Sequence, residues 1–243
     1  MRFKCAALLV CLALPGVVAM AWLALPGLVA ARALPVPLAT LQLATALQNA
    51  VLVLAATLVG LWAAPKVGLS SPVVLALAGG GRVREALRAG AVPALLGGCG
   101  GALVILGFHA FAPAALVDAL SETRLPLVVR VLYGGLTEEV FLRWGLMSAI
   151  AWAAWRLCQP RAPGPSAAVL WTAIILSALM FGLSHLPAVA HALQPMPMSV
   201  VVYVTFGNTL FGLIAGYLFW RHGLEAAMGA HVLAHVLAYL AQA

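Results

Sequence analysis

Ionisable side chains stand inside three long apolar segments of this 243-residue chain. They are Glu138, Glu139, Arg143, His185, His231 and His235. A charge within the hydrocarbon of a membrane is costly, so such residues are functional by default and are expected to face a partner or a polar cavity. Carboxylates and imidazoles are also the groups that transfer protons and stabilise oxyanions in hydrolytic enzymes. The residue types therefore indicate hydrolysis or proton transfer within a membrane.

The two adjacent glutamates have different neighbours. If the segment is an α-helix, residues four apart share a face, and Glu139 and Arg143 are suited to an ion pair. Glu138 projects about 100° away from Glu139 and is the carboxylate that remains available to take a proton from water. Gly134 and Gly135, one turn earlier, allow close approach of a backbone or a substrate. The alternative is a buried ion network in which all three charged residues brace the helix packing.

The histidines lie on two later segments. His185 follows Phe181 by one helical turn, and a lone histidine in a membrane is also a common partner in interhelical hydrogen bonds. His231 and His235 are four apart on one helical face, which is a spacing used by zinc ligands. The HExxH motif, however, requires Glu directly after the first histidine, and Val232 stands there. Without a metal, such a pair can orient water, donate to an oxyanion or protonate a leaving amine.

The rest of the sequence predicts an all-α, polytopic membrane protein. Hydrophobic residues make up 65% of the chain, charged residues 8%, and the mean hydropathy is +1.09, far more apolar than a soluble domain. Cutting the chain at charges, prolines and glycines leaves about seven spans near the length that crosses a bilayer. These are about 5–31, 38–62, 91–113, 125–156, 168–188, 198–220 and 223–241. We expect one bundle and a single membrane domain over residues 1–243.

The net charge of +7 comes from Lys and Arg at the ends of the apolar runs, which suits lipid headgroups rather than nucleic acid. Residues 66–89 are expected to form a loop with a short basic interfacial helix. Nine Lys and Arg on one side stand against Arg32, Arg124 and Arg130 on the other, which favours a cytoplasmic N-terminus. In that topology His185 lies near the outer end of its helix and His231 about 12 Å from the inner end of its own. A shared site then requires tilted helices.

Three motifs in this order resemble those of the CAAX protease and bacteriocin-processing (CPBP, or Abi) family of intramembrane endopeptidases. They are Glu138-Glu139-x-x-x-Arg143, Phe181-x-x-x-His185 and His231-x-x-x-His235. The similarity covers roughly residues 128–239. It implies that Glu138 activates water, that Glu139 and Arg143 support it, and that His185 and His231 are the motif histidines.

The chain departs from the family at one position, because the family often has Asn where His235 stands, and the charge of an imidazole depends on pH. The family has been described both as metalloproteases and as glutamate-dependent enzymes, so zinc is a possible cofactor, with Glu138, His185 and His231 as its ligands. The Ala-, Leu- and Gly-rich composition is typical of a high-GC bacterium. We therefore expect a protein of the bacterial cytoplasmic membrane that cleaves a membrane-anchored protein or peptide.

The expected catalytic core covers about residues 125–241. Two other functions are compatible with the same residues. A proton-coupled transporter would string its acids and histidines along the membrane normal. A non-catalytic immunity or binding protein would use them only for packing.

Overall fold

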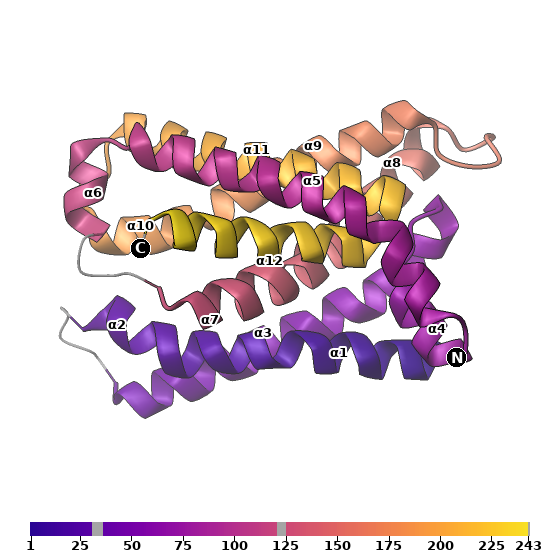
Figure 1. Cartoon of the computed structure of the whole chain (residues 1–243), viewed down its shortest axis with the longest axis horizontal. Coiled ribbons are helices and arrows are strands. Elements are labelled where there is room, and N and C mark those ends of the chain that lie inside the picture. The colour runs from indigo at the N-terminus through magenta and orange to yellow at the C-terminus, as the bar shows by residue number, and fades with distance from the viewer. Residues whose placement is uncertain (31–35, 121–124, 243) are drawn as a thin grey trace.

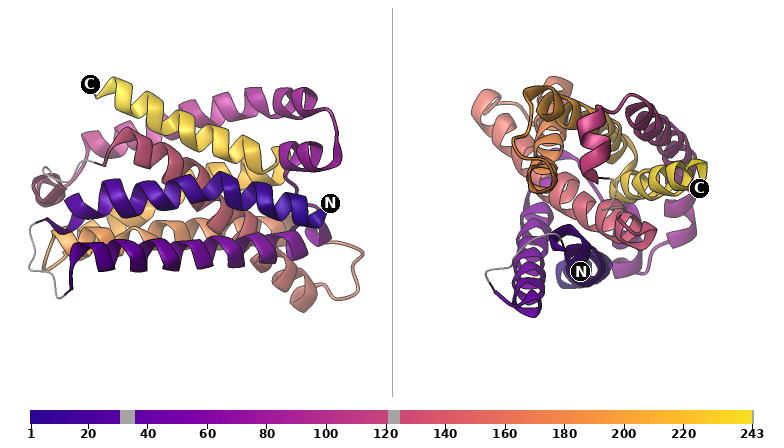
Figure 2. Two further views of the ribbon diagram at one scale, coloured as in Figure 1. Left: turned by 90° about the horizontal axis from the view of Figure 1, so that it is seen from below. Right: turned by 90° about the vertical axis from the view of Figure 1, so that its left-hand side faces the viewer.

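The computed structural model describes residues 1–30, 36–120 and 125–242, and these residues form helices joined by turns, with no strand among them. The long helices run side by side in one bundle, with the N- and C-termini at opposite ends (Figure 1; Figure 2). The predicted all-α membrane bundle is confirmed. Arg32 and Arg124, which entered the prediction of orientation, lie outside the described residues, and the orientation stays a prediction.

The first half of the described chain contains eight helical elements. They are α1 (Arg2–Ala19), η1 (Met20–Ala24), α2 (Leu25–Val29), α3 (Leu38–Ala63), η2 (Ala64–Val67), α4 (Pro72–Gly79), α5 (Val83–Ala110) and α6 (Ala114–Leu120). The second half contains eight more. They are α7 (Leu127–Val129), η3 (Arg130–Glu138), η4 (Val140–Met147), α8 (Ser148–Cys158), α9 (Ala167–Ser184), α10 (Leu186–Ala192), α11 (Met198–His222) and α12 (Leu224–Ala241).

Six stretches of the described chain are long and apolar enough to cross a membrane. They are Arg2–Val29, Leu38–Val67, Val83–Ala110, Ala167–Ala192, Met198–His222 and Leu224–Ala241. The remaining predicted span, 125–156, corresponds to the unbroken helical run from α7 to α8. This run carries Glu138, Glu139 and Arg143 and is called the polar run below. This polar run lies inside the bundle, which agrees with the prediction of about seven helices.

The prediction of a short basic helix in residues 66–89 is wrong. The short helix there is the apolar α4, and the basic residues Arg84 and Arg88 belong to the first turns of α5. Gly90 and Pro93 do not interrupt α5, because the residues around them continue the helical hydrogen bonding. Long basic side chains at the end of a span can still reach the headgroups.

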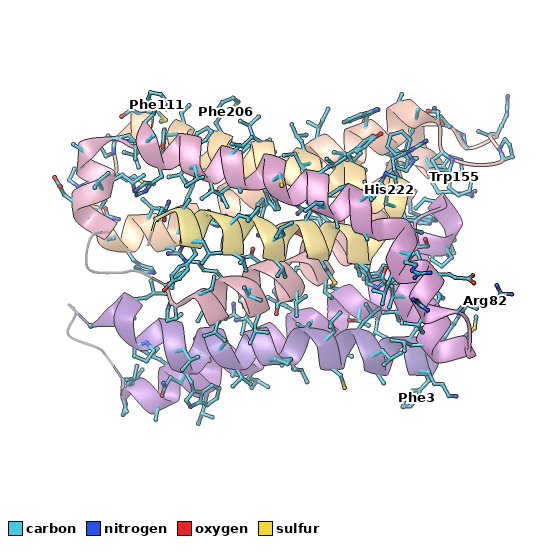
Figure 3. The ribbon with its side chains drawn as sticks, viewed as in Figure 1. Phe3, Arg82, Phe111, Trp155, Phe206 and His222 are labelled. Atoms are coloured by element: carbon cyan, nitrogen blue, oxygen red, sulfur yellow. The ribbon has the colours of Figure 1, made fainter. Side chains whose placement is uncertain are left out.

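The polar run is surrounded by its neighbours. Helix α12 contacts both α5 and η3, α11 packs against α9, and α1 and α3 lie against η3 and η4. The other side of the bundle is apolar and exposed: Phe111 beyond α5 and Phe206 on α11 are 83% and 56% exposed and project outward in Figure 3. That surface is suited to lipid, while Glu139 and Arg143 are enclosed.

The helix that carries the glutamates is wound differently from the α-helix assumed from its sequence. Its central elements η3 and η4 are π-helices, in which each N–H bonds to the carbonyl five residues earlier. The Thr137 hydroxyl contacts the carbonyl of Leu132, five residues back, at 3.2 Å, and the carbonyl of Ala13 in α1 at 2.7 Å. Gly16 of α1 faces the same place, where a Cβ would collide with Thr137 and Leu132. Contacts with α1 therefore accompany the wide winding of η3.

Candidate active site

A buried ionic cluster lies at the centre of the bundle. Glu139 stands between η3 and η4, and its Oε1 lies 2.8 Å from Nδ1 of His231 on α12. Its Oε2 lies 3.4 Å from Nε of Arg143, and the side chains of Glu139 and Arg143 are both 0% exposed. The predicted spacing of Glu139 and Arg143 thus does bring the two charges together. The third member, His231, was not expected to bond to Glu139.

Arg143 extends the cluster towards α9 and α11. Its Nη2 donates to the carbonyl of Gly212 at 3.4 Å, and its guanidinium carbon lies 5.1 Å from the centre of the Phe181 ring. Guanidinium groups are attracted to aromatic faces at such distances. The Arg143 side chain thereby links the polar run to two neighbouring helices.

Phe181 connects the histidines of the two later motifs. Its ring centre lies 4.8 Å from that of His185 and 5.9 Å from that of His231. Because both imidazoles contact one phenyl ring, the two predicted histidines share a site, although His185 follows the end of α9 and His231 lies within α12. The predicted topology placed the two histidines at different depths in the membrane, but the structure brings them together. It also differs from the string of groups along the membrane normal that a proton-coupled transporter would need.

The hydrogen bond of His185 fixes which of its nitrogens is protonated. His185 follows the last residue of α9, and its Nδ1 lies 2.8 Å from the carbonyl oxygen of Phe181. A carbonyl oxygen can only accept, so Nδ1 must carry the hydrogen. The Nε2 atom of the neutral ring is left as an acceptor.

His235 stacks on His231, with ring centres 5.0 Å apart. Both rings reach Gly134 of η3: a Cβ on that residue would lie 3.0 Å from Nε2 of His235 and 3.5 Å from Nε2 of His231. The next residue, Gly135, packs so closely on Val232 that a side chain would not fit. The two glycines therefore bring the polar run against α12 and leave the two Nε2 atoms uncovered by a side chain from this position.

Glu138 differs from its neighbour as the sequence suggested. It is partly buried, and its carboxylate makes no hydrogen bond or ion pair with any residue that the structure describes. Glu139, by contrast, is occupied by both Arg143 and His231. Glu138 is therefore the carboxylate of the pair that can bind water.

Two further polar residues near the site were not identified from the sequence. Tyr133, on η3, donates a hydrogen bond of 2.8 Å to Oδ1 of Asn49 on α3. The signal that could have found them is Asn49 itself, an amide within the apolar span 38–62, because polar side chains inside a membrane require partners.

The predicted zinc ligands do not form a metal site. Over residues 1–30, 36–120 and 125–242, no three His, Cys, Asp or Glu side chains are grouped so that they could hold a metal ion. Glu138, His185 and His231 are therefore not arranged as the ligands of a zinc ion.

Comparisons with known proteins agree with the motifs. The family model described as type II CAAX prenyl endopeptidase Rce1-like matches residues 119–237. Comparison with curated proteins and with solved structures gave no match. The matched region contains all six ionisable residues of the site, so the resemblance based on the three motifs is confirmed. Over residues 119–237, just under half of its length, the chain is therefore similar to the Rce1-like family of type II CAAX prenyl endopeptidases, a part of the CPBP family.

Proposed function

We propose that the protein is an intramembrane endopeptidase that hydrolyses a peptide bond of a membrane-associated protein or peptide. The observation that carries the proposal is the convergence of Glu139, His185 and His231 on Phe181 and Arg143. Glu138 lies next to them and is paired with none of the residues that the structure describes. Structural ion networks also occur in membrane bundles. A packing role alone, however, gives no reason for a second carboxylate without a partner beside a paired one.

In the proposed reaction, Glu138 is the general base. It takes one proton from a water molecule, and the water oxygen forms a bond with the carbonyl carbon of the substrate. The carbonyl oxygen becomes an oxyanion, and the proton held by Glu138 then passes to the nitrogen as the C–N bond breaks. The products are one carboxylic acid and one amine. General-base catalysis of this type contributes about 10²–10⁴-fold to the rate.

The histidines serve the substrate in this reaction. Nε2 of His185, with Nδ1 held by the Phe181 carbonyl, accepts a hydrogen bond from the N–H of the peptide bond that is cleaved. His231 and His235 lie beside Gly134, where an Nε2 atom that carries a hydrogen donates it to the oxyanion. Glu139 and Arg143 do not react. Glu139 holds His231 in place, and Arg143 pairs with Glu139 and so keeps its carboxylate from binding the water.

The test is cleavage of a defined peptide by purified protein in detergent micelles. The probe is a quenched fluorescent peptide ending in a farnesylated cysteine and three further residues, together with the same peptide bearing an unmodified cysteine. Glu138→Gln should lower kcat by about 10²–10⁴-fold. The matched control is Glu85→Gln, which makes the same change at an exposed residue of α5 and should leave the rate unchanged.

Each comparison in this assay decides one point. Cleavage by Glu138→Gln at the wild-type rate would refute the proposed base. Cleavage of both peptides would show that the prenyl group is not required for recognition. Loss of activity with a chelator, restored by zinc, would overturn the metal-free mechanism while leaving the peptidase assignment in place.

A further inference from the structure

Asn49 is a polar residue halfway along the apolar helix α3, and both ends of its amide are occupied. Its Nδ2 donates to the carbonyl oxygen of Thr45 at 2.8 Å, and its Oδ1 accepts from the Tyr133 hydroxyl at 2.8 Å. Asn49 thereby links α3 to the π-helix η3, which ends at Glu138.

The direction of these hydrogen bonds follows from the chemistry of the groups. The Thr45 carbonyl can only accept, so the NH₂ of Asn49 faces it and the amide oxygen faces Tyr133. That amide oxygen can also only accept, so the single hydrogen of the Tyr133 hydroxyl is committed to Asn49. Towards every other group, the Tyr133 oxygen can act only as an acceptor.

Tyr133 is placed next to Glu138. The two residues are five apart, which is the spacing of successive turns in a π-helix, and the groups are close enough to interact electrostatically. The Tyr133 ring is held by an edge contact with Phe141, with ring centres 6.4 Å apart. A fixed acceptor therefore stands beside a carboxylate that no described residue occupies.

We propose that the hydrogen-bonded pair Asn49 and Tyr133 positions the water that Glu138 activates. A water molecule has two hydrogens. One is donated to the Glu138 carboxylate and the other to the Tyr133 hydroxyl oxygen, which leaves a lone pair of the water directed away from both and available to the carbonyl carbon. Tyr133 and Asn49 are thus positioning residues, neither the base nor the oxyanion donor. The inference rests on the proposed function.

The plain alternative is that the pair only joins α3 to η3, as polar side chains often do between membrane helices. The two interpretations predict different results. A purely structural bond affects stability and leaves the turnover of folded protein unchanged. A positioning bond affects kcat with little change in KM, because it acts on the attacking water rather than on the substrate.

The test measures kcat and KM for the farnesylated peptide, together with thermal unfolding in detergent, for Tyr133→Phe, Asn49→Leu and the double variant. Tyr133→Phe should lower kcat by about 10- to 100-fold, as displacement of a reacting group does, with KM changed by less than about twofold. The control is Tyr203→Phe, which removes a hydroxyl that makes no hydrogen bond and lies between α5 and α11, on the outer side of the bundle. It should keep both constants.

The kcat of Asn49→Leu, compared with that of the double variant, distinguishes the two interpretations. Without the amide oxygen, the Tyr133 hydroxyl is free to donate to Glu138 and compete with the water, so kcat should fall at least as far as in Tyr133→Phe. Removing the hydroxyl as well should end that competition. The double variant is therefore expected to be no less active than Asn49→Leu.

Full turnover by folded Tyr133→Phe would overturn the inference and leave the pair as interhelical packing. A double variant whose kcat falls by the product of the two single losses would also overturn it, because the residues would then act independently. These outcomes are distinct from failure of the proposed function. If Glu138→Gln cleaves like the wild type, or the wild type cleaves neither peptide, both proposals fall together.

Discussion

Removal of Arg143 tests whether the buried cluster holds the bundle together. Arg143→Met keeps an unbranched apolar stem but deletes the charge, which leaves Glu139 fully buried with His231 as its remaining partner. Breaking a buried ion pair from one side destabilises a protein by about 3–5 kcal/mol. Since His231 still bonds Oε1 of Glu139, we expect the lower end, about 3 kcal/mol. At 2–4 °C per kcal/mol for a chain of this size, the midpoint of thermal unfolding should fall by roughly 6–12 °C.

The control removes both charges together. In Glu139→Gln with Arg143→Met, the amide oxygen can still accept from His231, and no charge is left uncompensated. Replacing both members of a buried pair is often nearly neutral, so the double variant should lose no more than about 1 kcal/mol. Unfolding is followed by intrinsic fluorescence in detergent micelles. Either of two results refutes the reasoning: Arg143→Met as stable as the wild type, or a double variant as unstable as Arg143→Met.

Two further predictions concern other parts of the site and its frame. Gly134→Ala should reduce kcat/KM by about 100-fold, because the new methyl group would stand 3.0 Å from Nε2 of His235. The control Gly27→Ala places its methyl group in open space and should leave kcat/KM unchanged. Equal activities of the two variants would contradict this role of Gly134. Glu225 accepts hydrogen bonds from the Ser71 hydroxyl at 2.6 Å and from the first turn of α4 at 2.8 Å, so Glu225→Ala should destabilise the protein by about 1 kcal/mol. Glu225→Gln, whose amide oxygen can still accept these hydrogen bonds, should lose less stability, and thermal unfolding of the two variants side by side provides the check.

The helical fold could be predicted because the hydrocarbon of a membrane restricts the backbone conformations that a spanning segment can adopt. Backbone groups in hydrocarbon must be satisfied within the segment, so apolar runs of the length of α3 or α11 are expected to be helices. The pairing of Glu139 with Arg143 was equally accessible, since residues four apart meet on one face of a helix. Such inferences need only local spacing.

The partner of His231 could not be obtained in this way. Two adjacent carboxylates were available to that imidazole, and the sequence offers no rule for choosing between them. The choice depends on how α12 lies across η3, which is set by the close contact of Gly135 with Val232. That contact joins segments almost a hundred residues apart, and no local spacing predicts it.

Tyr133 and Asn49 were missed for a different reason. The pattern that indicated the site consists of side chains that can be charged near neutral pH, and neither Tyr133 nor Asn49 is such a residue. Asn49 was detectable as an amide within an apolar span, but its partner was not. The Tyr133 hydroxyl reaches Asn49 only because α3 packs beside the polar run.

The π-winding of the polar run explains how adjacent glutamates can have separate tasks. A π-helix places more residues in each turn than the 3.6 of an α-helix, so neighbouring side chains diverge by less, and both Glu138 and Glu139 can remain on the inner side of the bundle. The same winding brings residues five apart closer together, which sets Tyr133 one turn before Glu138, while Arg143 pairs with Glu139. Glu139 also reaches His231. Local widening of one helix thus separates a braced carboxylate from a free one, and π-helical turns are frequent at functional sites.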